Sequence, residues 1–199
     1  MPSMYKLVRG FQSLLHIILL KIKFGNKFTV SLKQDISRST CIEVRENSKI
    51  IIDGLIHTKK NVELKSFNGG VLKIAPRCTF NNNCMIASGK SITIETGTIF
   101  GPNVVVVDHD HDFRTVNNIL EAKYICKDIY IGKNVWIGAN VVILKGTTIG
   151  DNSVIGAGCI ISGNIEENSV IIQKKELKIG KIKKEKQNDS IINSYSVLE

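Results

Sequence analysis

The sequence predicts an all-β fold: a parallel β-helix of short stacked strands, with a protruding loop and a short N-terminal helix. Isoleucine opens six successive hexapeptides, at positions 131, 137, 143, 149, 155 and 161, and the fifth residue of each is small or β-branched. A period of six fits neither an α-helix nor an ordinary strand, but it fits a short strand followed by a turn. With 199 residues, 43% of them hydrophobic, the chain is also long enough to bury a core.

Residues 1–27 are expected to form an amphipathic helix, because apolar side chains recur there at helical spacing among basic ones. The apolar positions are Leu7, Phe11, Leu14, Ile18 and Ile22, and the basic ones are Lys6, Arg9, Lys21 and Lys23. Two interpretations stay open: a cap on the open end of the solenoid, or peripheral contact with an anionic membrane. The apolar stretch is too short to span a bilayer and no small-residue cleavage site follows it, so a signal peptide is not expected.

Residues 28–172 are predicted to be the β-helix domain. Strand-like segments with looser spacing run from 28 to 73, where we expect irregular first coils. The period of six then appears at Ile74, Phe80 and Ile86, and it resumes at residues 94, 100 and 106 after a slip of two residues. Cys78, Cys84 and Cys159 fall at the fifth position of their hexapeptides, so we interpret them as interior packing residues.

The loop is predicted at residues 109–127. Val106 and Ile131 are 25 positions apart where one repeat needs six, so the insertion has roughly 19 extra residues, and insertions in solenoids project from one face. Its first residues, in the stretch VVVVDHDHDF, place two histidines between aspartates.

Residues 173–199 are predicted to be a basic tail. The formal net charge of +9 is concentrated in this tail and in residues 1–27, which leaves the body nearly neutral. A neutral body argues against a nucleic-acid groove. The five cysteines include no CxxC spacing, so neither a disulfide framework nor a zinc site is expected, and a cytoplasmic location is the expectation.

The tract IGKNVWIGANVVILKGTTIGDNSVIGAGCIIS and the D-H-x-H pattern before it resemble the hexapeptide-repeat, left-handed β-helix acyltransferases. Within these, the pattern is similar to the maltose and galactoside O-acetyltransferase branch, which includes capsule- and lipopolysaccharide-modifying enzymes. The resemblance covers about residues 70–172. It implies a left-handed coil, a homotrimer, and acetyl-CoA bound between neighbouring solenoids, with no metal.

The resemblance also implies the site residues. Acetyl transfer to a hydroxyl needs a base, and a neutral imidazole suits that role. Counting eight residues on from Asn103 selects His111 as the catalytic histidine, with His109 second. Either Asp108 or Asp110 is available to orient the imidazole.

Polar groups that contact the acceptor are expected at Asn83 and Asn81, with Trp136 beside the coenzyme channel. For Asn83 and Asn81 the simpler interpretation is a solenoid turn, and for Trp136 it is packing against the loop. Positions that would line the coenzyme are Ala139, Ala157, Ser162, Lys178 and Lys181. The family's G-x-P segment after the last coil is missing, which leaves the register of the two lysines open.

The function predicted on these grounds is acetyl-CoA-dependent O-acetylation of a saccharide hydroxyl, in surface polysaccharide biosynthesis, by direct transfer. Alternatives are an N-acetyltransferase of an amino sugar or an antibiotic acetyltransferase. More remote alternatives are a non-catalytic solenoid and a metal enzyme similar to the γ-class carbonic anhydrases. The latter needs a third imidazole, but His16 lies in the expected helix and His57 in an early coil, so a third ligand is hard to find.

Overall fold

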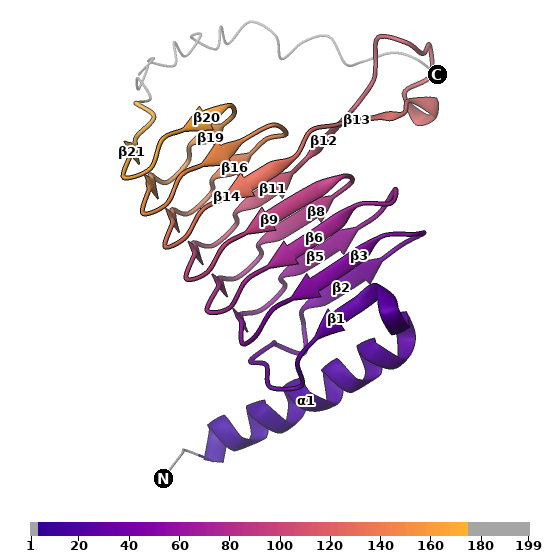
Figure 1. Cartoon of the computed structure of the whole chain (residues 1–199), viewed down its shortest axis with the longest axis vertical. Coiled ribbons are helices and arrows are strands. Elements are labelled where there is room, and N and C mark those ends of the chain that lie inside the picture. Colours follow the sequence, from indigo (N-terminus) through magenta and orange to yellow (C-terminus); the bar gives the residue numbers. More distant parts are fainter. Residues whose placement is uncertain (1–3, 175–199) are drawn as a thin grey trace, which may run out of the picture.

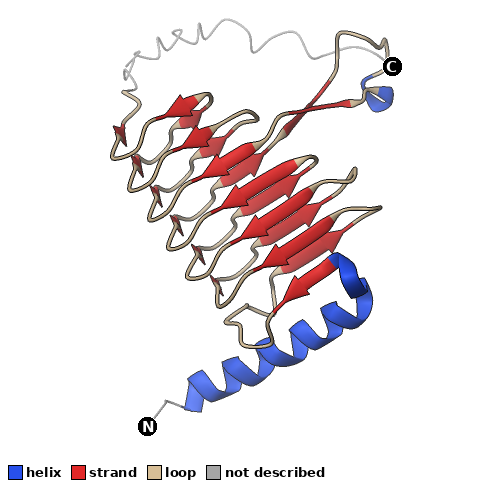
Figure 2. Cartoon of the chain, in the orientation of Figure 1, coloured by secondary structure: helices blue, strands red, loops and turns tan. Residues whose placement is uncertain are grey.

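The computed structural model describes residues 4–174 and contains a parallel β-solenoid closed at one end by a helix (Figures 1 and 2). Its strands form three parallel sheets, here called A, B and C, and each coil normally gives one strand to each sheet. Sheet A has seven strands, and sheets B and C have six each. The predicted β-helix with a loop and an N-terminal helix is confirmed.

Each sheet collects strands from successive coils of the solenoid. Sheet A consists of β1 (Phe28–Val30), β3 (Lys49–Ile52), β6 (Val71–Ile74), β9 (Ser91–Ile94), β14 (Ile129–Ile131), β17 (Thr148–Ile149) and β20 (Asn164–Ile165). Sheet B consists of β4 (His57–Thr58), β7 (Thr79–Phe80), β10 (Ile99–Phe100), β15 (Trp136–Ile137), β18 (Val154–Ile155) and β21 (Val170–Ile171). Sheet C consists of β2 (Cys41–Val44), β5 (Glu63–Ser66), β8 (Met85–Ser88), β11 (Val105–Val107), β16 (Val142–Ile143) and β19 (Ile160–Ile161).

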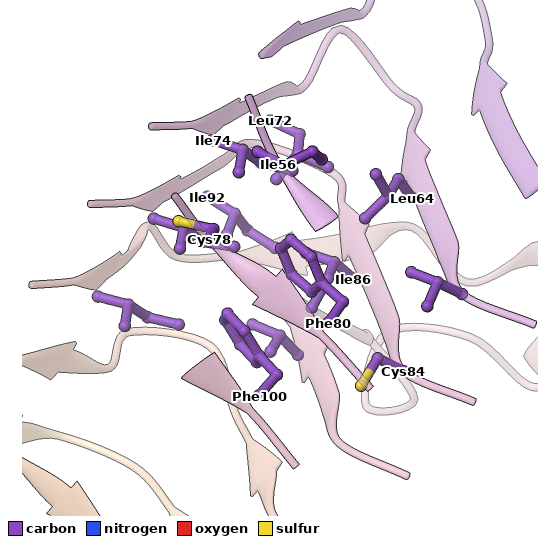
Figure 3. Packing of buried hydrophobic residues seen from close by; sticks show 14 of the residues in the cluster. Ile56, Leu64, Leu72, Ile74, Cys78, Phe80, Cys84, Ile86, Ile92 and Phe100 are labelled. Atoms are coloured by element: carbon purple, nitrogen blue, oxygen red, sulfur yellow. The ribbon is translucent and has the colours of Figure 1, made fainter. Parts of the chain in front are cut away.

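The core is a set of inward columns that run along the solenoid axis (Figure 3). The six repeat isoleucines are all buried, and Cys78, Cys84 and Cys159 are buried among them as predicted. Phe80 and Phe100 stack in successive coils, with ring centroids 4.6 Å apart and planes inclined by 15°. Aligned apolar columns remove side chains from water without any layer of covering helices.

The first coils are longer than three hexapeptides. The first of them is irregular as expected, because residues 31–40 give sheet B only an isolated bridge from Asp35 to His57 instead of a strand. The coils that follow up to residue 73 are regular, which corrects the expectation for them. Ile50 pairs with Leu72, 22 positions on, whereas Thr148 pairs with Asn164, 16 positions on. Strands β3 and β6 of sheet A and β2 and β5 of sheet C have four residues and turn two side chains inward instead of one. The two-residue slip in the sequence has the same cause, because Ile92 and Ile94 of β9 are both buried.

Asparagines in the left-handed conformation turn the corners between sheets B and C. Asn61, Asn83, Asn103 and Asn140 have φ between 55° and 60°, a region that asparagine tolerates. Each donates or accepts a side-chain amide hydrogen bond to the next along the stack, at N···O distances of 3.0–3.3 Å. This ladder satisfies polar groups of the turns and links one coil to the next.

Helix α1 (Met4–Phe24) crosses the open end of the solenoid beneath β1, and the short helix η1 (Gly25–Lys27) joins the two (Figure 1). Ile17 and Leu20 are buried against the core. Ser13 Oγ accepts a hydrogen bond from the Ile36 amide at 3.0 Å and donates one to the Gln34 carbonyl at 2.9 Å. The helix therefore acts as a cap. Over residues 4–174 no helix is long and apolar enough to cross a membrane.

The insertion leaves the solenoid as a two-stranded antiparallel ribbon instead of an open loop. Strand β12 (His109–His111) pairs with β13 (Tyr124–Cys126), and the short helix η2 (Ile119–Glu121) lies between them. The ribbon projects away from the stack beyond β11 (Figure 1). Both predicted histidines are therefore held in a strand.

Candidate functional site

Asp108 is a fully buried carboxylate at the point where the ribbon leaves the solenoid. It continues an inward column of sheet C whose earlier members, Val44, Ser66 and Ser88, pair in register. Its position is set by alternation, because Val104 and Val106 also point inward. A buried charge requires several partners, and Asp108 has them.

Five groups donate hydrogen bonds to Asp108. The Gly89 amide donates to Oδ1 at 2.6 Å, and the amides of Lys90 and Ser91 donate to Oδ2 at 2.9 Å each. Ser88 Oγ adds a contact to Oδ2 at 3.1 Å. Burial alone would raise the pKa of this carboxyl, but the hydrogen bonds from His109, the amides and Ser88 outweigh it and lower the pKa. Asp108 is therefore ionised at neutral pH.

The fifth partner is His109, whose Nδ1 lies 3.2 Å from Asp108 Oδ1. Its ring packs edge-on against Phe67 and Tyr124, with centroid distances of 4.9 and 5.1 Å, and the side chain is 17% exposed. A carboxylate at Nδ1 favours the tautomer with the proton on that nitrogen, which leaves Nε2 with a free lone pair. This arrangement suits a general base.

His111 lies two residues further along β12 and is exposed. Its ring is 4.8 Å from that of Tyr124. The neighbouring Asp110 forms an ion pair with Lys145 instead of a contact with either imidazole. Of the two aspartates considered from the sequence, Asp108 is the one that orients a histidine.

The His109 ring lines a recess of about 260 Å³ on the face of sheet C. Phe67 and Tyr124 line it beside the histidine, and Glu43, Arg45 and Lys65 supply charges. Glu43 accepts a hydrogen bond from Arg45 at 2.5 Å. A recess with an aromatic wall and several charged groups suits a polar ligand such as a sugar.

A second hollow, of about 440 Å³, lies along the corner that follows sheet B. Asn81, Trp136, Ala139 and Ala157 line it, so four of the predicted binding residues lie together. The coils approach closely here, and a Cβ atom added to Gly138 would lie 2.7 Å from the Ala157 nitrogen. The result is a shallow groove, long in the direction of the stack and walled by an exposed tryptophan.

The recess and the groove share no lining residue and belong to different sheets of the chain. Asn83 lies in neither, because its amide is part of the asparagine ladder. Ser162 is exposed after β19 and does not line the groove. Lys178 and Lys181 lie outside the described residues. Within one chain, the two predicted coenzyme-binding residues that line the groove, Ala139 and Ala157, therefore lie in a different hollow from both His109 and its recess.

Across residues 4–174, no three histidine, cysteine, aspartate or glutamate side chains cluster closely enough to hold a metal ion. His57, one candidate for a third ligand, hydrogen-bonds through Nδ1 to Asp35 at 2.6 Å near the capped end. The other, His16, lies in α1.

Comparison with known proteins supports the fold. Residues 128–163 match the model of the bacterial transferase hexapeptide family (six repeats). No curated protein sequence matches at a significant level. A hexapeptide-repeat acetyltransferase from Vibrio cholerae O1 biovar eltor, crystallised with acetyl-coenzyme A, is 22% identical, with a TM-score of 0.51 over 85% of this chain and 84% of that one.

Two further crystal structures are similar. AntD, an N-acyltransferase from Bacillus cereus solved with dTDP and 3-hydroxybutyryl-CoA, is 19% identical, with a TM-score of 0.58 over 77% of this chain and 81% of that one. A maltose O-acetyltransferase from Clostridium difficile 630 is 24% identical and covers 81% of each chain, with a TM-score of 0.44. Residues 128–163 thus carry the hexapeptide repeat of bacterial transferases, in a chain with the left-handed parallel β-helix fold.

Proposed function

We propose that the protein is an acetyl-CoA-dependent O-acetyltransferase that acts on a saccharide hydroxyl, with His109 as the general base. The observation that carries the proposal is the pairing of His109 with the buried Asp108 at the edge of a sugar-sized recess. This choice reverses the order suggested by spacing, which placed His111 first. An acceptor from a surface polysaccharide and a cytoplasmic location, in keeping with five free cysteines, complete the proposal.

The reaction needs no covalent enzyme intermediate. The acceptor hydroxyl oxygen attacks the thioester carbonyl carbon of acetyl-CoA while His109 Nε2 takes the hydroxyl proton. The C–S bond then breaks, and the imidazolium returns the proton to the leaving sulfur. Asp108 stabilises the transient positive charge on His109, because it is already ionised and held by backbone amides.

The separation of recess and groove favours an assembly in which one subunit supplies His109 and its neighbour supplies the groove at Ala157. Mixing two impaired variants tests this. His109→Ala lacks the base and Ala157→Leu binds acetyl-CoA weakly, so both have low turnover when acetyl-CoA is well below the KM of Ala157→Leu. Unfolded and refolded together, they are expected to regain part of the activity under these conditions, since some mixed interfaces hold two intact halves. A mixture whose turnover stays at the level of the two variants despite forming mixed assemblies would contradict the shared site.

N-acyl transfer is a second candidate, because Glu43 in the recess provides a carboxylate for an amine acceptor. Thiol release from acetyl-CoA, measured over paired hydroxyl and amino sugars, distinguishes the two. We expect turnover with hydroxyl acceptors, and turnover only with the amino partners would replace the proposal by N-acylation. Absence of thiol release with every saccharide would refute both.

Substitution of each histidine tests the base. His109→Ala is expected to lower turnover by roughly 10²–10⁴-fold. His111→Ala is the matched control in the same strand, and we expect it to lower turnover by less than about tenfold. The opposite pattern would restore the spacing-based choice.

A further inference from the structure

Helix α1 buries only one of its faces against the solenoid. Ser13, Ile17 and Leu20 face the core, whereas a second row of apolar side chains is exposed. That row consists of Met4, Val8, Phe11, Leu15, Leu19 and Ile22, which we call the outer row. Its spacing of three or four residues places it along one side of the helix. Capping accounts for the buried face and leaves the outer row unexplained.

The outer row borders a large apolar groove. The groove measures about 790 Å³ and is lined by Phe11, Leu15 and Leu19, with Lys23 and Arg38 also among its lining residues. Phe11 is 69% exposed and Ile22 76%. A continuous apolar strip of this kind, exposed to solvent, marks a binding surface.

The groove continues into a basic recess. Val8, Gln12 and Arg38 line both hollows, and the second, of about 520 Å³, adds Lys59 and Lys60. Arg38, Lys59 and Lys60 are exposed, and none of them forms an ion pair with another described residue. Three unpaired cations thus stand beside the apolar strip.

The N-terminal segment that forms this end carries charge of one sign. The first 34 residues contain six lysines and arginines and no acidic residue. Within the described part of that segment, Arg9 binds Asp35 and the Thr58 carbonyl and so belongs to the cap itself. Lys21 and Lys27 donate to the carbonyls of Val30 and Glu46, and Lys23 lines the groove beside the outward apolar face of the helix. That combination is typical of helices that lie in the interface of anionic membranes.

We propose that the capped end of the solenoid docks on an anionic lipid bilayer. The outer row enters the interface with α1 parallel to the membrane plane, and lipid phosphates bind Arg38, Lys59 and Lys60. A second copy of this face fits less well, because it would bring two cationic rims together. A free phosphate ion bound to these cations would not explain the apolar groove beside them. The proposal does not depend on the reaction that the protein catalyses.

Sedimentation of the full chain with vesicles tests the proposal. We expect binding to vesicles of equal parts phosphatidylglycerol and phosphatidylcholine, and little binding to pure phosphatidylcholine. Phe11→Gln/Leu15→Gln should weaken binding at least about tenfold through lost apolar contact. Arg38→Ala/Lys60→Ala should weaken it about fivefold per removed charge and reduce its dependence on salt.

The matched controls lie far from α1. Leu120→Gln replaces an apolar side chain that is 90% exposed at the loop tip, and Lys133→Ala removes an exposed charge from a turn. Both should bind vesicles as the unchanged chain does. Thermal unfolding midpoints check folding, since all the substituted side chains are exposed.

Three results would overturn the proposal: no binding of the unchanged chain to anionic vesicles, equal binding to neutral ones, or unchanged binding of Phe11→Gln/Leu15→Gln. Light scattering tests the alternative that a second copy of the chain binds the outer row. If the unchanged chain does not bind vesicles, and the assembly of Phe11→Gln/Leu15→Gln has half the molar mass of the unchanged assembly, the outer row is a contact between copies.

Discussion

Replacement of Asp108 by asparagine separates the two roles of this carboxylate. Asparagine has nearly the same shape, but one of its terminal atoms donates hydrogen bonds instead of accepting them. If its oxygen takes the Oδ2 position, the bonds from Lys90 and Ser91 are kept. Its NH₂ group then faces the Gly89 amide and His109, which both lose their acceptor.

The magnitude follows from these contacts. One buried amide without a partner and one lost charge-assisted bond should lower the free energy of unfolding by about 2–5 kcal/mol. The NH₂ group would donate to His109 Nδ1 and so move the imidazole proton to Nε2. Nε2 would then carry the proton and have no free lone pair to accept the proton of the acceptor hydroxyl. Turnover should therefore fall roughly 10²–10⁴-fold.

Three measurements check this reasoning on Asp108→Asn. Thiol release from acetyl-CoA gives turnover at a temperature where guanidinium titration shows the variant folded, and ¹⁵N chemical shifts of the His109 ring report its tautomer. Near-normal turnover with an unchanged tautomer would refute the assigned role. A folded but inactive variant with a shifted tautomer is the expected result.

The remaining predictions concern packing, reactivity, coenzyme access and pH. Phe80→Ala should lower the free energy of unfolding by about 3–5 kcal/mol in chemical denaturation, because it leaves a cavity beside the stacked ring of the next coil. Burial raises the pKa of Cys78 to about 11, so iodoacetamide at neutral pH should modify the exposed Cys41 and spare Cys78 until the chain unfolds, as read by mass spectrometry. Ala157→Leu should raise KM for acetyl-CoA at least about tenfold without moving the unfolding midpoint, because the side chain is exposed in the groove. The lowered pKa of Asp108 contributes stability that is present at neutral pH and lost as the pH falls below the ordinary carboxyl value of 3.8 and through the folded-state pKa. In acid titrations of stability, Asp108→Asn should lack this component, and an identical acid profile would contradict it.

The columns of the core could be predicted from the sequence because a strict period fixes which positions face inward. Ile131 and its successors at intervals of six are buried for that reason. The four-residue strands were harder to recognise, although Leu72 and Ile74 carry the signal of two apolar residues separated by one. Ile74 belongs both to this alternation and to the period of six. Because the period of six is the longer pattern, a prediction based on it misses the alternation that marks a longer strand.

The role of Asp108 had a signal in the sequence that counting from Asn103 does not capture. Val104, Val106 and Asp108 are two positions apart, so in a strand they lie on the same face. The inward valines therefore predict that the Asp108 carboxylate also points inward. Its partners could not be predicted, because the amides of Gly89 and Ser91 reach it only through the stacking of one coil on the next. The separation of recess and groove likewise depends on which sheet or corner of the solenoid each lining residue occupies. The number of residues between them in the sequence does not determine that.

The ribbon joins the solenoid through a narrow, fixed junction. The Lys127 amide donates to the Asp108 carbonyl at 2.9 Å, and His109 pairs with Cys126, so the two ends of the insertion are held side by side. Closing a loop whose ends are already held costs little more when the loop grows, since the entropy depends only logarithmically on length. The tip between Asp112 and Lys123 can therefore be exchanged for segments of other lengths without disturbing the stack. His109 and Tyr124, which line the recess, lie on the solenoid side of this tip and would keep their places.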